Sequence, residues 1–174
     1  MDIEIEAKLK VDSLQNVEQR LKQAGGEFVA KQIQKDFYFD DAVAGFASCD
    51  KALRLRQQTE SGRQKVFLTY KGPKEKDNYK KRSEIEVEVG NFELTEQLLL
   101  ALRFKRAIIV EKEREVWNVL DCKVALDKVG QLGTFVEIEG PADSSISKVQ
   151  RDLGLENLPN ITKTYAELIR EAFP

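Results

Sequence analysis

Apolar and polar residues alternate with period two along much of the chain, most strictly at residues 3–8 and 133–139. That period is typical of a β-strand with one polar and one apolar face. The polar faces carry Glu4, Glu6 and Lys8 in the first stretch, and Glu137 and Glu139 in the last. Carboxylates two residues apart on a strand lie about 7 Å apart, so two such strands side by side would offer several oxygens to one hard cation. The simpler alternative is that both faces are the wet sides of ordinary antiparallel strands.

The rest of the pattern predicts six more strands and four helices. The strands are expected at residues 27–40, 51–57, 64–71, 80–89, 108–119 and 123–129, with loops at 41–50 and 74–80. The helices are predicted from four apolar stripes: Leu14, Val17, Leu21 and Ala24; Leu94, Leu98, Ala101 and Leu102; Ile146, Val149 and Leu153; Tyr165, Leu168, Ile169 and Phe173. We expect N-caps at Asp12 for the first helix and Thr162 for the last. Strands and helices do not alternate regularly, which predicts an antiparallel α+β fold in a single domain spanning residues 1–174.

Charged side chains recur on one face of most predicted strands, opposite largely aliphatic faces. The charged set is Glu4, Glu6, Lys8, Arg54, Arg56, Lys65, Lys71, Arg82, Glu84, Glu86, Glu88, Lys112, Arg114, Asp127, Glu137 and Glu139. If helices cover the apolar exterior of a closed barrel, these charges line its interior. If the sheet is flat with helices on one side, they form a solvated face instead. Both arrangements fit the pattern, and Lys65 and Glu88 are equally consistent with solvated strand ends.

A barrel lined by both signs of charge has a definite chemical consequence. Buried ions are costly unless they are paired or bound to a ligand, so such an interior should be hydrated. Lysine and arginine bind phosphate oxygens, whereas carboxylates bind Mg²⁺ or Mn²⁺. The barrel arrangement therefore predicts a site for a triphosphate or polyphosphate with divalent cations.

The composition excludes several other classes of function. The chain has 174 residues, 41% of them hydrophobic, and a net charge of −2, which disfavours nucleic-acid binding and membrane-surface binding. It contains no histidine, so catalytic triads and histidine-ligated zinc are excluded. The two cysteines cannot form a disulfide framework. We find no signal peptide and no apolar run of membrane-spanning length, and we expect a cytoplasmic protein whose oligomeric state is open, a homodimer included.

At residues 4–8 the sequence Glu-Ile-Glu-Ala-Lys resembles the E-x-E-x-K signature of the CYTH superfamily, the triphosphate tunnel metalloenzymes. That superfamily includes class IV adenylyl cyclases and thiamine triphosphatases. The resemblance continues in order through residues 52–56, 68–73, 82–86, 110–114, 126–127 and 133–139. Among its branches the chain looks most like proteins named as class IV adenylyl cyclases. It departs from that branch at residues 44–46, where the family often has Arg-Asp-Phe and this chain has Ala-Gly-Phe.

The resemblance implies an eight-stranded antiparallel tunnel with flanking amphipathic helices, and it implies roles by position. The implied metal ligands are Glu4, Glu6, Asp127, Glu137 and Glu139, with Glu84 and Glu86 as further tunnel acids. The implied triphosphate-binding residues are Lys8, Arg54, Arg56, Lys71, Arg82, Lys112, Arg114, Lys163 and Tyr165, among which Lys8, Lys71 and Arg114 are the expected catalytic residues. Glu111, Glu113 and Glu115 are expected on the outer surface.

We therefore expect an enzyme that uses Mg²⁺ or Mn²⁺ to act on a nucleoside, thiamine or inorganic triphosphate. The leading hypothesis is conversion of ATP to cyclic AMP and pyrophosphate. The alternatives are hydrolysis of a triphosphate and a polyphosphate-binding module without turnover. No nucleic-acid or membrane partner is expected.

Overall fold

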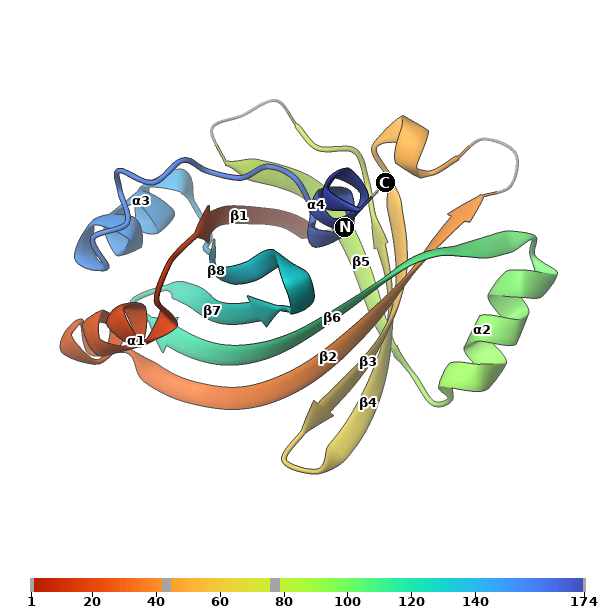
Figure 1. Cartoon of the computed structure of the whole chain (residues 1–174), viewed down its shortest axis with the longest axis horizontal. Coiled ribbons are helices and arrows are strands. Elements are labelled where there is room, and N and C mark those ends of the chain that lie inside the picture. The colour runs from red at the N-terminus through yellow and green to blue at the C-terminus, as the bar shows by residue number, and fades with distance from the viewer. Residues whose placement is uncertain (1, 42–44, 76–78, 174) are drawn as a thin grey trace.

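The computed structural model describes residues 2–41, 45–75 and 79–173, and its centre is a closed antiparallel β-barrel (Figure 1). The strands follow one another around the barrel in the order β1-β5-β4-β3-β2-β6-β7-β8. Their bounds are Asp2–Lys10 for β1, Glu27–Asp41 for β2, Ala52–Glu60 for β3, Arg63–Lys71 for β4, Lys80–Val89 for β5, Phe104–Val119 for β6, Cys122–Val129 for β7 and Gly133–Glu139 for β8. The closed form predicted from the family resemblance is confirmed, and the flat sheet is wrong.

Closure of the barrel brings the two ends of the chain together. Strand β1 pairs with β8, with Glu6 opposite Glu139 and Lys8 opposite Glu137. The first and last alternating stretches of the sequence are therefore neighbours. The long strand β2 is continuous rather than broken, and two register shifts in its pairing with β6 bend it around the barrel.

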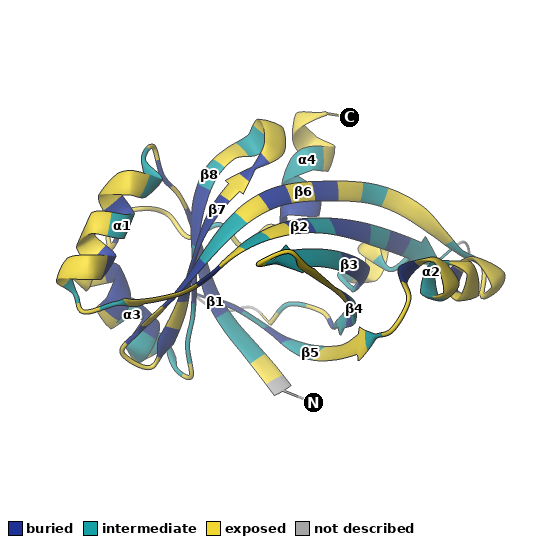
Figure 2. Cartoon of the chain, turned by 90° about the horizontal axis from the view of Figure 1, so that it is seen from below, coloured by how far each residue is buried: buried dark blue, intermediate teal, exposed yellow. Residues whose placement is uncertain are grey.

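Two helices cover the apolar exterior on one side of the barrel. Helix α1 (Leu14–Gln23) and helix α3 (Asp143–Asp152) pack over β1, β7 and β8, and their apolar faces join one core with outward residues such as Trp117, Val124 and Ile138. Figure 2 shows that the strands are buried beneath them. This is the arrangement that alternating strands require when charges occupy the interior.

The helix caps differ from the predicted ones by one or two residues. Ser13, not Asp12, caps α1 by accepting a hydrogen bond from the backbone N–H of Asn16. Helix α4 (Tyr165–Ala172) begins after Thr164 rather than Thr162, because Thr164 forms a reciprocal capping box with Glu167.

Helix α2 (Phe92–Ala101) buries a different face from the predicted one. Phe92 and Leu99 pack into a core with β2 and β3 residues such as Phe37 and Leu55. The predicted stripe faces solvent instead, with Leu94 65%, Leu98 59% and Leu102 60% exposed. The prediction was wrong because apolar residues surround this helix, so that spacing alone did not identify the buried side.

The expected loops are only partly described. Residues 42–44 and 76–78 lie outside the described part of the chain, and with them Ala44 of the family departure. Between them, Ala47–Cys49 forms a short 3₁₀ helix. No helix among the described residues is long and apolar enough to cross a membrane.

Candidate functional site

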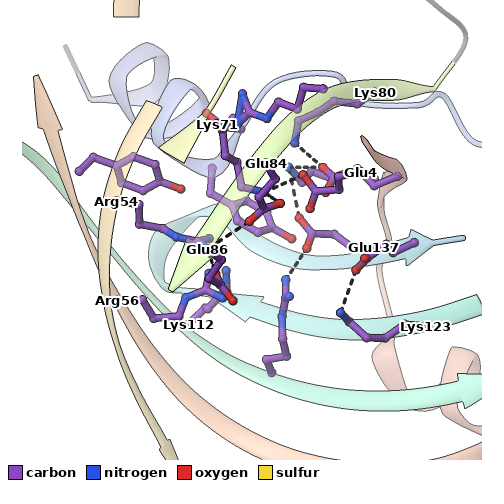
Figure 3. A pocket seen from close by; sticks show the side chains of 18 of the residues that line it. Glu4, Arg54, Arg56, Lys71, Lys80, Glu84, Glu86, Lys112, Lys123 and Glu137 are labelled. Atoms are coloured by element: carbon purple, nitrogen blue, oxygen red, sulfur yellow. Dashed lines mark hydrogen bonds and ion pairs between the residues drawn. The ribbon is translucent and has the colours of Figure 1, made fainter. Parts of the chain in front are cut away.

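The barrel encloses a cavity of about 370 Å³ lined almost wholly by charged side chains (Figure 3). Its wall includes all but two of the site residues predicted from the sequence: Glu4, Glu6, Lys8, Arg54, Arg56, Lys71, Arg82, Glu84, Glu86, Lys112, Arg114, Glu137, Glu139 and Tyr165. Alternation places them there, because each strand turns every second residue inward. Residues from both ends of the sequence thus share one hydrated interior.

The two exceptions are Asp127 and Lys163. Asp127 is fully buried and accepts two hydrogen bonds from Arg114, at 2.7 and 2.5 Å, and one from the Tyr165 hydroxyl at 2.8 Å. The Lys163 ammonium points elsewhere and pairs with Glu171 at 2.7 Å. Lys163 meets the site only through its backbone carbonyl, which accepts a hydrogen bond from Lys8 at 3.0 Å. Asp127 lies on the inner face of β7 and holds two lining residues, Arg114 and Tyr165, in place.

Strands β1, β4 and β5 bring acids and bases into direct contact. Lys71 lies 2.7 Å from Glu4 and 2.9 Å from Glu84, and Lys80 lies 2.5 Å from Glu6. Burial alone would lower the pKa of Lys71, but Glu4, Glu6 and Glu84 together outweigh it and the pKa is raised. This ammonium group is therefore charged at neutral pH.

Strands β1, β6 and β8 meet in a second network. Lys8 lies 3.3 Å from Glu137 and 4.3 Å from the centre of the Tyr165 ring, and Arg114 also pairs with Glu137. Burial would raise the pKa of Glu137, yet Arg114 and Lys8 hold it well below its usual range. The pKa of the Tyr165 hydroxyl is raised well above 10 by burial and by Glu137 and Asp127, so this residue stays neutral and donates a hydrogen bond.

Arg54, Arg56 and Lys112 form one side of the cavity, which we call the base-rich wall. It contains a carboxylate that the sequence analysis missed. Asp36 on β2 is completely buried and accepts hydrogen bonds from Arg56 at 2.6 and 2.8 Å. Lys112 lies 3.5 Å from the same carboxylate and Arg54 3.9 Å. Burial would raise the pKa of Asp36, but these three bases hold it far below its usual range. Asp36 is thus a fixed anion at the centre of the phosphate-binding residues predicted from β3 and β6.

Alternation along β2 contained the signal for Asp36. Gln32, Gln34, Asp36 and Tyr38 occupy one face of the strand, while Phe37 and Phe39 occupy the other. The sequence analysis considered the aromatic residues on the outer face of this strand and overlooked the polar residues on its inner face. Lys80 was missed as well, because it lies at the boundary between a predicted charged loop and a strand.

Within the described part of the chain, the Nε atoms of two buried arginines have no hydrogen-bond partner. Arg54 donates to Thr69 at 3.0 Å and to Glu86 at 3.1 Å through one terminal nitrogen, but its Nε has no acceptor among the described residues. The Nε of Arg82, which is 3% exposed, likewise lacks one in that part of the chain. Buried N–H groups are normally satisfied, and each unsatisfied one costs about 1–3 kcal/mol. Both Nε atoms are inaccessible from the cavity, so a ligand would meet these arginines through their terminal nitrogens unless the side chains move.

Two lysines in the wall have lowered pKa values. Burial, reinforced by Arg114, lowers the pKa of Lys112 to about 7 despite the opposing charge of Asp36. Burial also lowers the pKa of Lys80 to about 8, although Glu6 opposes the change. Both amines therefore lose their protons more readily near neutral pH than an exposed lysine does.

The carboxylates fit a divalent cation in kind, because the cavity offers only oxygen donors on β1 and β8, the ligands that Mg²⁺ and Mn²⁺ prefer. These carboxylates do not converge on one point, however. Across residues 2–41, 45–75 and 79–173, no three acidic or cysteine side chains converge closely enough to hold a metal ion. Glu4, Glu6 and Glu137 are each paired with lysine or arginine, and Glu139 pairs with Lys123 at 2.8 Å. Cation binding would have to exchange these ion pairs.

Residues 2–165 match the family model described as the CYTH domain. The chain belongs to the CYTH family. Members of this family are enzymes that act on triphosphates and use divalent metals. The family resemblance drawn from the ordered motifs is thereby confirmed across nearly the whole chain.

Proteins similar to this chain differ in what their names say. The chain is 38% identical over 162 residues to "Putative adenylate cyclase MJ0240" of Methanocaldococcus jannaschii, covering 92% of this chain and 88% of that protein. The structure of the PH1819 protein of Pyrococcus horikoshii matches with a TM-score of 0.87 and 32% identity, covering 97% of this chain and 99% of that one. A Hippeastrum protein described as a putative adenylyl cyclase with a dominant triphosphatase activity matches with a TM-score of 0.73 over 97% and 96% of the two chains, but at 18% identity it shares the fold alone.

Proposed function

We propose that this protein binds a nucleoside or organic triphosphate inside its barrel and cleaves it with the aid of Mg²⁺ or Mn²⁺, and that conversion of ATP to cyclic AMP and pyrophosphate is its leading activity. The observation that carries the proposal is the convergence of buried lysine and arginine side chains from β1, β3, β4, β5 and β6 on one cavity. The relative named as an adenylate cyclase, at 38% identity, supports the choice of product.

Several arginine and lysine side chains would bind the phosphates together. Arg54, Arg56 and Lys112 project into the cavity from neighbouring strands and would contact the phosphate oxygens together. Bidentate arginine contacts fix orientation as well as charge. Such positioning lowers the barrier to in-line displacement, because little covalent chemistry is required of the protein.

Lys8, Lys71 and Arg114 are the proposed catalytic residues. Each is a buried cation already facing a carboxylate. A bound triphosphate would share these cations, which can then stabilise the negative charge that develops on the leaving phosphate. The Tyr165 hydroxyl donates a hydrogen bond to Asp127 at 2.8 Å. This bond fixes the Tyr165 ring, over which the Lys8 ammonium lies.

The residues that would hold a divalent cation are Glu4, Glu6, Glu137 and Glu139, with Asp127 as a buried neighbour. When bound, the cation would neutralise phosphate oxygens and polarise the attacking hydroxyl. The chain's own part is to keep these carboxylates ionised. Lys8 and Arg114 do so at Glu137, whose pKa they hold well below its usual range against the effect of burial.

Hydrolysis is the second candidate, and the lining of the cavity favours it in one respect. Besides the charged residues, the wall contains only Ile3, Tyr38, Thr164 and Tyr165. The cavity wall itself thus supports triphosphate recognition, whereas the aromatic residues that could contact an adenine ring, Tyr38, Phe39 and Phe46, line an adjoining pocket. A triphosphatase needs only the former.

Product analysis tests the proposal directly. The purified protein is incubated with ATP, thiamine triphosphate or tripolyphosphate, each with Mg²⁺ or Mn²⁺, and the products are resolved by chromatography and phosphorus NMR. Cyclic AMP with pyrophosphate supports the cyclase, and phosphate with a diphosphate product supports hydrolysis. Tight binding without turnover of any of the three would overturn the enzymatic proposal in favour of a polyphosphate-binding module.

A further inference from the structure

A row of inward side chains crosses strands β7, β8, β1 and β5 with the charge order plus, minus, minus, plus. The residues that lie opposite one another in successive strands are Lys123, Glu139, Glu6 and Lys80. All members of the row line the cavity. Lys80 and Lys123 approach the carboxylates from opposite sides (Figure 3). The row is therefore a central pair of carboxylates with one lysine on each side.

Each carboxylate of the central pair is held by its own lysine. The Lys80 ammonium lies 2.5 Å from Glu6, and both side chains are less than a tenth exposed. The Lys123 ammonium lies 2.8 Å from Glu139, and both of these side chains are about half exposed. Like charges directly opposite one another on paired strands destabilise the sheet. The two lysines thus neutralise a pair of carboxylates that the pairing of β1 with β8 places together.

We propose that Lys80 and Lys123 block Glu6 and Glu139 from a divalent cation until a polyanion enters the cavity, so that the cation binds tightly only together with the triphosphate. The inference rests on the proposed function, which supplies the triphosphate. Two ammonium groups carry the same charge as one Mg²⁺ or Mn²⁺ ion, so their exchange leaves the charge of the row balanced. Lysine has a long, flexible side chain, whose ammonium can turn from a carboxylate to a phosphate oxygen.

The number of carboxylates in the row fits a cation that shares its ligands with a substrate. Mg²⁺ is usually held by one or two carboxylates together with substrate phosphates rather than by a cage of protein ligands. Within residues 2–41, 45–75 and 79–173, no three acidic or cysteine side chains converge on one point. Lys8 also lies 3.7 Å from Glu6, but it is shared with Glu137 at 3.3 Å. A bound triphosphate would supply the missing oxygens and draw the lysines away at the same time.

Binding of Mn²⁺ to the ligand-free protein tests the proposal without any measurement of turnover. Electron paramagnetic resonance follows the Mn²⁺ that remains free in solution during a titration. We expect weak binding to the wild type. Lys80→Met should tighten it by about tenfold to a hundredfold, the value of a charged hydrogen bond. Lys123→Met should tighten it by about tenfold or less, because its ion pair is half exposed.

Two further variants serve as controls. Lys65→Met removes the same charge from a lysine that pairs with Glu88 at 3.2 Å and does not line the cavity, so it should leave Mn²⁺ binding as weak as in the wild type. Lys80→Arg keeps a positive charge beside Glu6 and should also leave it weak. Thermal unfolding establishes that each variant is folded. Lys123→Met alters a half-exposed side chain and therefore tests the proposal independently of Lys80→Met.

A second titration, with tripolyphosphate present, measures the coupling between anion and cation. The direct attraction between Mn²⁺ and tripolyphosphate is common to all variants, so a difference between variants reports the displacement of the lysines. Tripolyphosphate should tighten Mn²⁺ binding by a larger factor in the wild type than in the Lys80→Met/Lys123→Met double variant.

Three results would overturn the proposal. The first is an equal factor in the wild type and the double variant, the second is tight Mn²⁺ binding to the ligand-free wild type, and the third is a Lys80→Met variant that binds Mn²⁺ no more tightly than Lys65→Met. A protein that cleaves no triphosphate would instead overturn the proposed function, and the titrations of the ligand-free protein would still decide the role of the two lysines.

Discussion

The two walls of the cavity hold their charges in different ways. On β2, β3 and β6, Arg54, Arg56 and Lys112 surround the completely buried Asp36. On β1 and β8, acids predominate. Glu4, Glu6 and Glu137 are paired within the cavity, whereas the pair of Glu139 with Lys123 reaches toward solvent, with the Glu139 side chain 44% exposed. Under the proposed function, the base-rich wall would bind the phosphates, and the acid-rich wall would exchange its ion pairs for a cation.

The largest effect should follow from Asp36→Asn. Removing one partner of a buried charge set costs about 3–5 kcal/mol, because Arg56 and Lys112 are left facing each other without compensation. Denaturant unfolding measures the loss. Glu139→Gln is the matched control on the other wall and should cost less than about 1 kcal/mol, as partly exposed pairs do. Equal losses would remove the distinction between the walls. Tripolyphosphate should restore stability to the Asp36 variant more than to the control.

A substitution on the base-rich wall should impair ligand binding, whereas a substitution among the acids of β1 and β8 should impair turnover. Arg56→Ala should weaken metal-free binding of tripolyphosphate by about tenfold to a hundredfold, the value of a charged hydrogen bond. Glu137→Gln should leave that binding nearly unchanged or tighter, since it removes a negative charge, yet abolish the metal dependence of turnover. Calorimetry with a chelator and assays with Mn²⁺ supply the two measurements. A Glu137 variant that loses metal-free binding would contradict the division.

The lowered pKa of Lys112, about 7, predicts proton uptake on binding. Above pH 7 its amine is partly neutral in the free protein, and a bound polyanion raises the pKa, so a fraction of a proton enters with the ligand and affinity falls as pH increases. Calorimetry in buffers of different ionisation enthalpy detects this. Lys112→Met should reduce the uptake, and uptake identical to the wild type would assign it to the ligand or to Lys80.

The smallest effect is expected at the end of the barrel. Lys65 and Glu88 lie 3.2 Å apart with side chains 56% and 54% exposed. Glu88→Gln should change stability by less than about 0.5 kcal/mol and leave turnover unaltered. A large loss of activity would extend the functional wall beyond the cavity.

The site was predictable because alternation is a local rule that fixes which side chains share the barrel interior. The alternation of Glu4 and Glu6 with isoleucines placed both carboxylates on one face of the strand, and the family resemblance placed that face inward. Closure itself was not predictable from the strands alone and entered through the family resemblance. Asp36 was not predicted, because its role depends on Arg56 and Lys112. These two residues lie on neighbouring strands and contact Asp36 only once the strands have paired. The exposed face of α2 escaped because leucines occupy more than one side of that helix.

The most direct test is a crystal structure with a non-hydrolysable ATP analogue and Mn²⁺, with the metal located by anomalous scattering. The account predicts phosphates against Arg54, Arg56 and Lys112, and manganese among the carboxylates of β1 and β8. Phosphates outside the barrel, or manganese on the Asp36 wall, would contradict it.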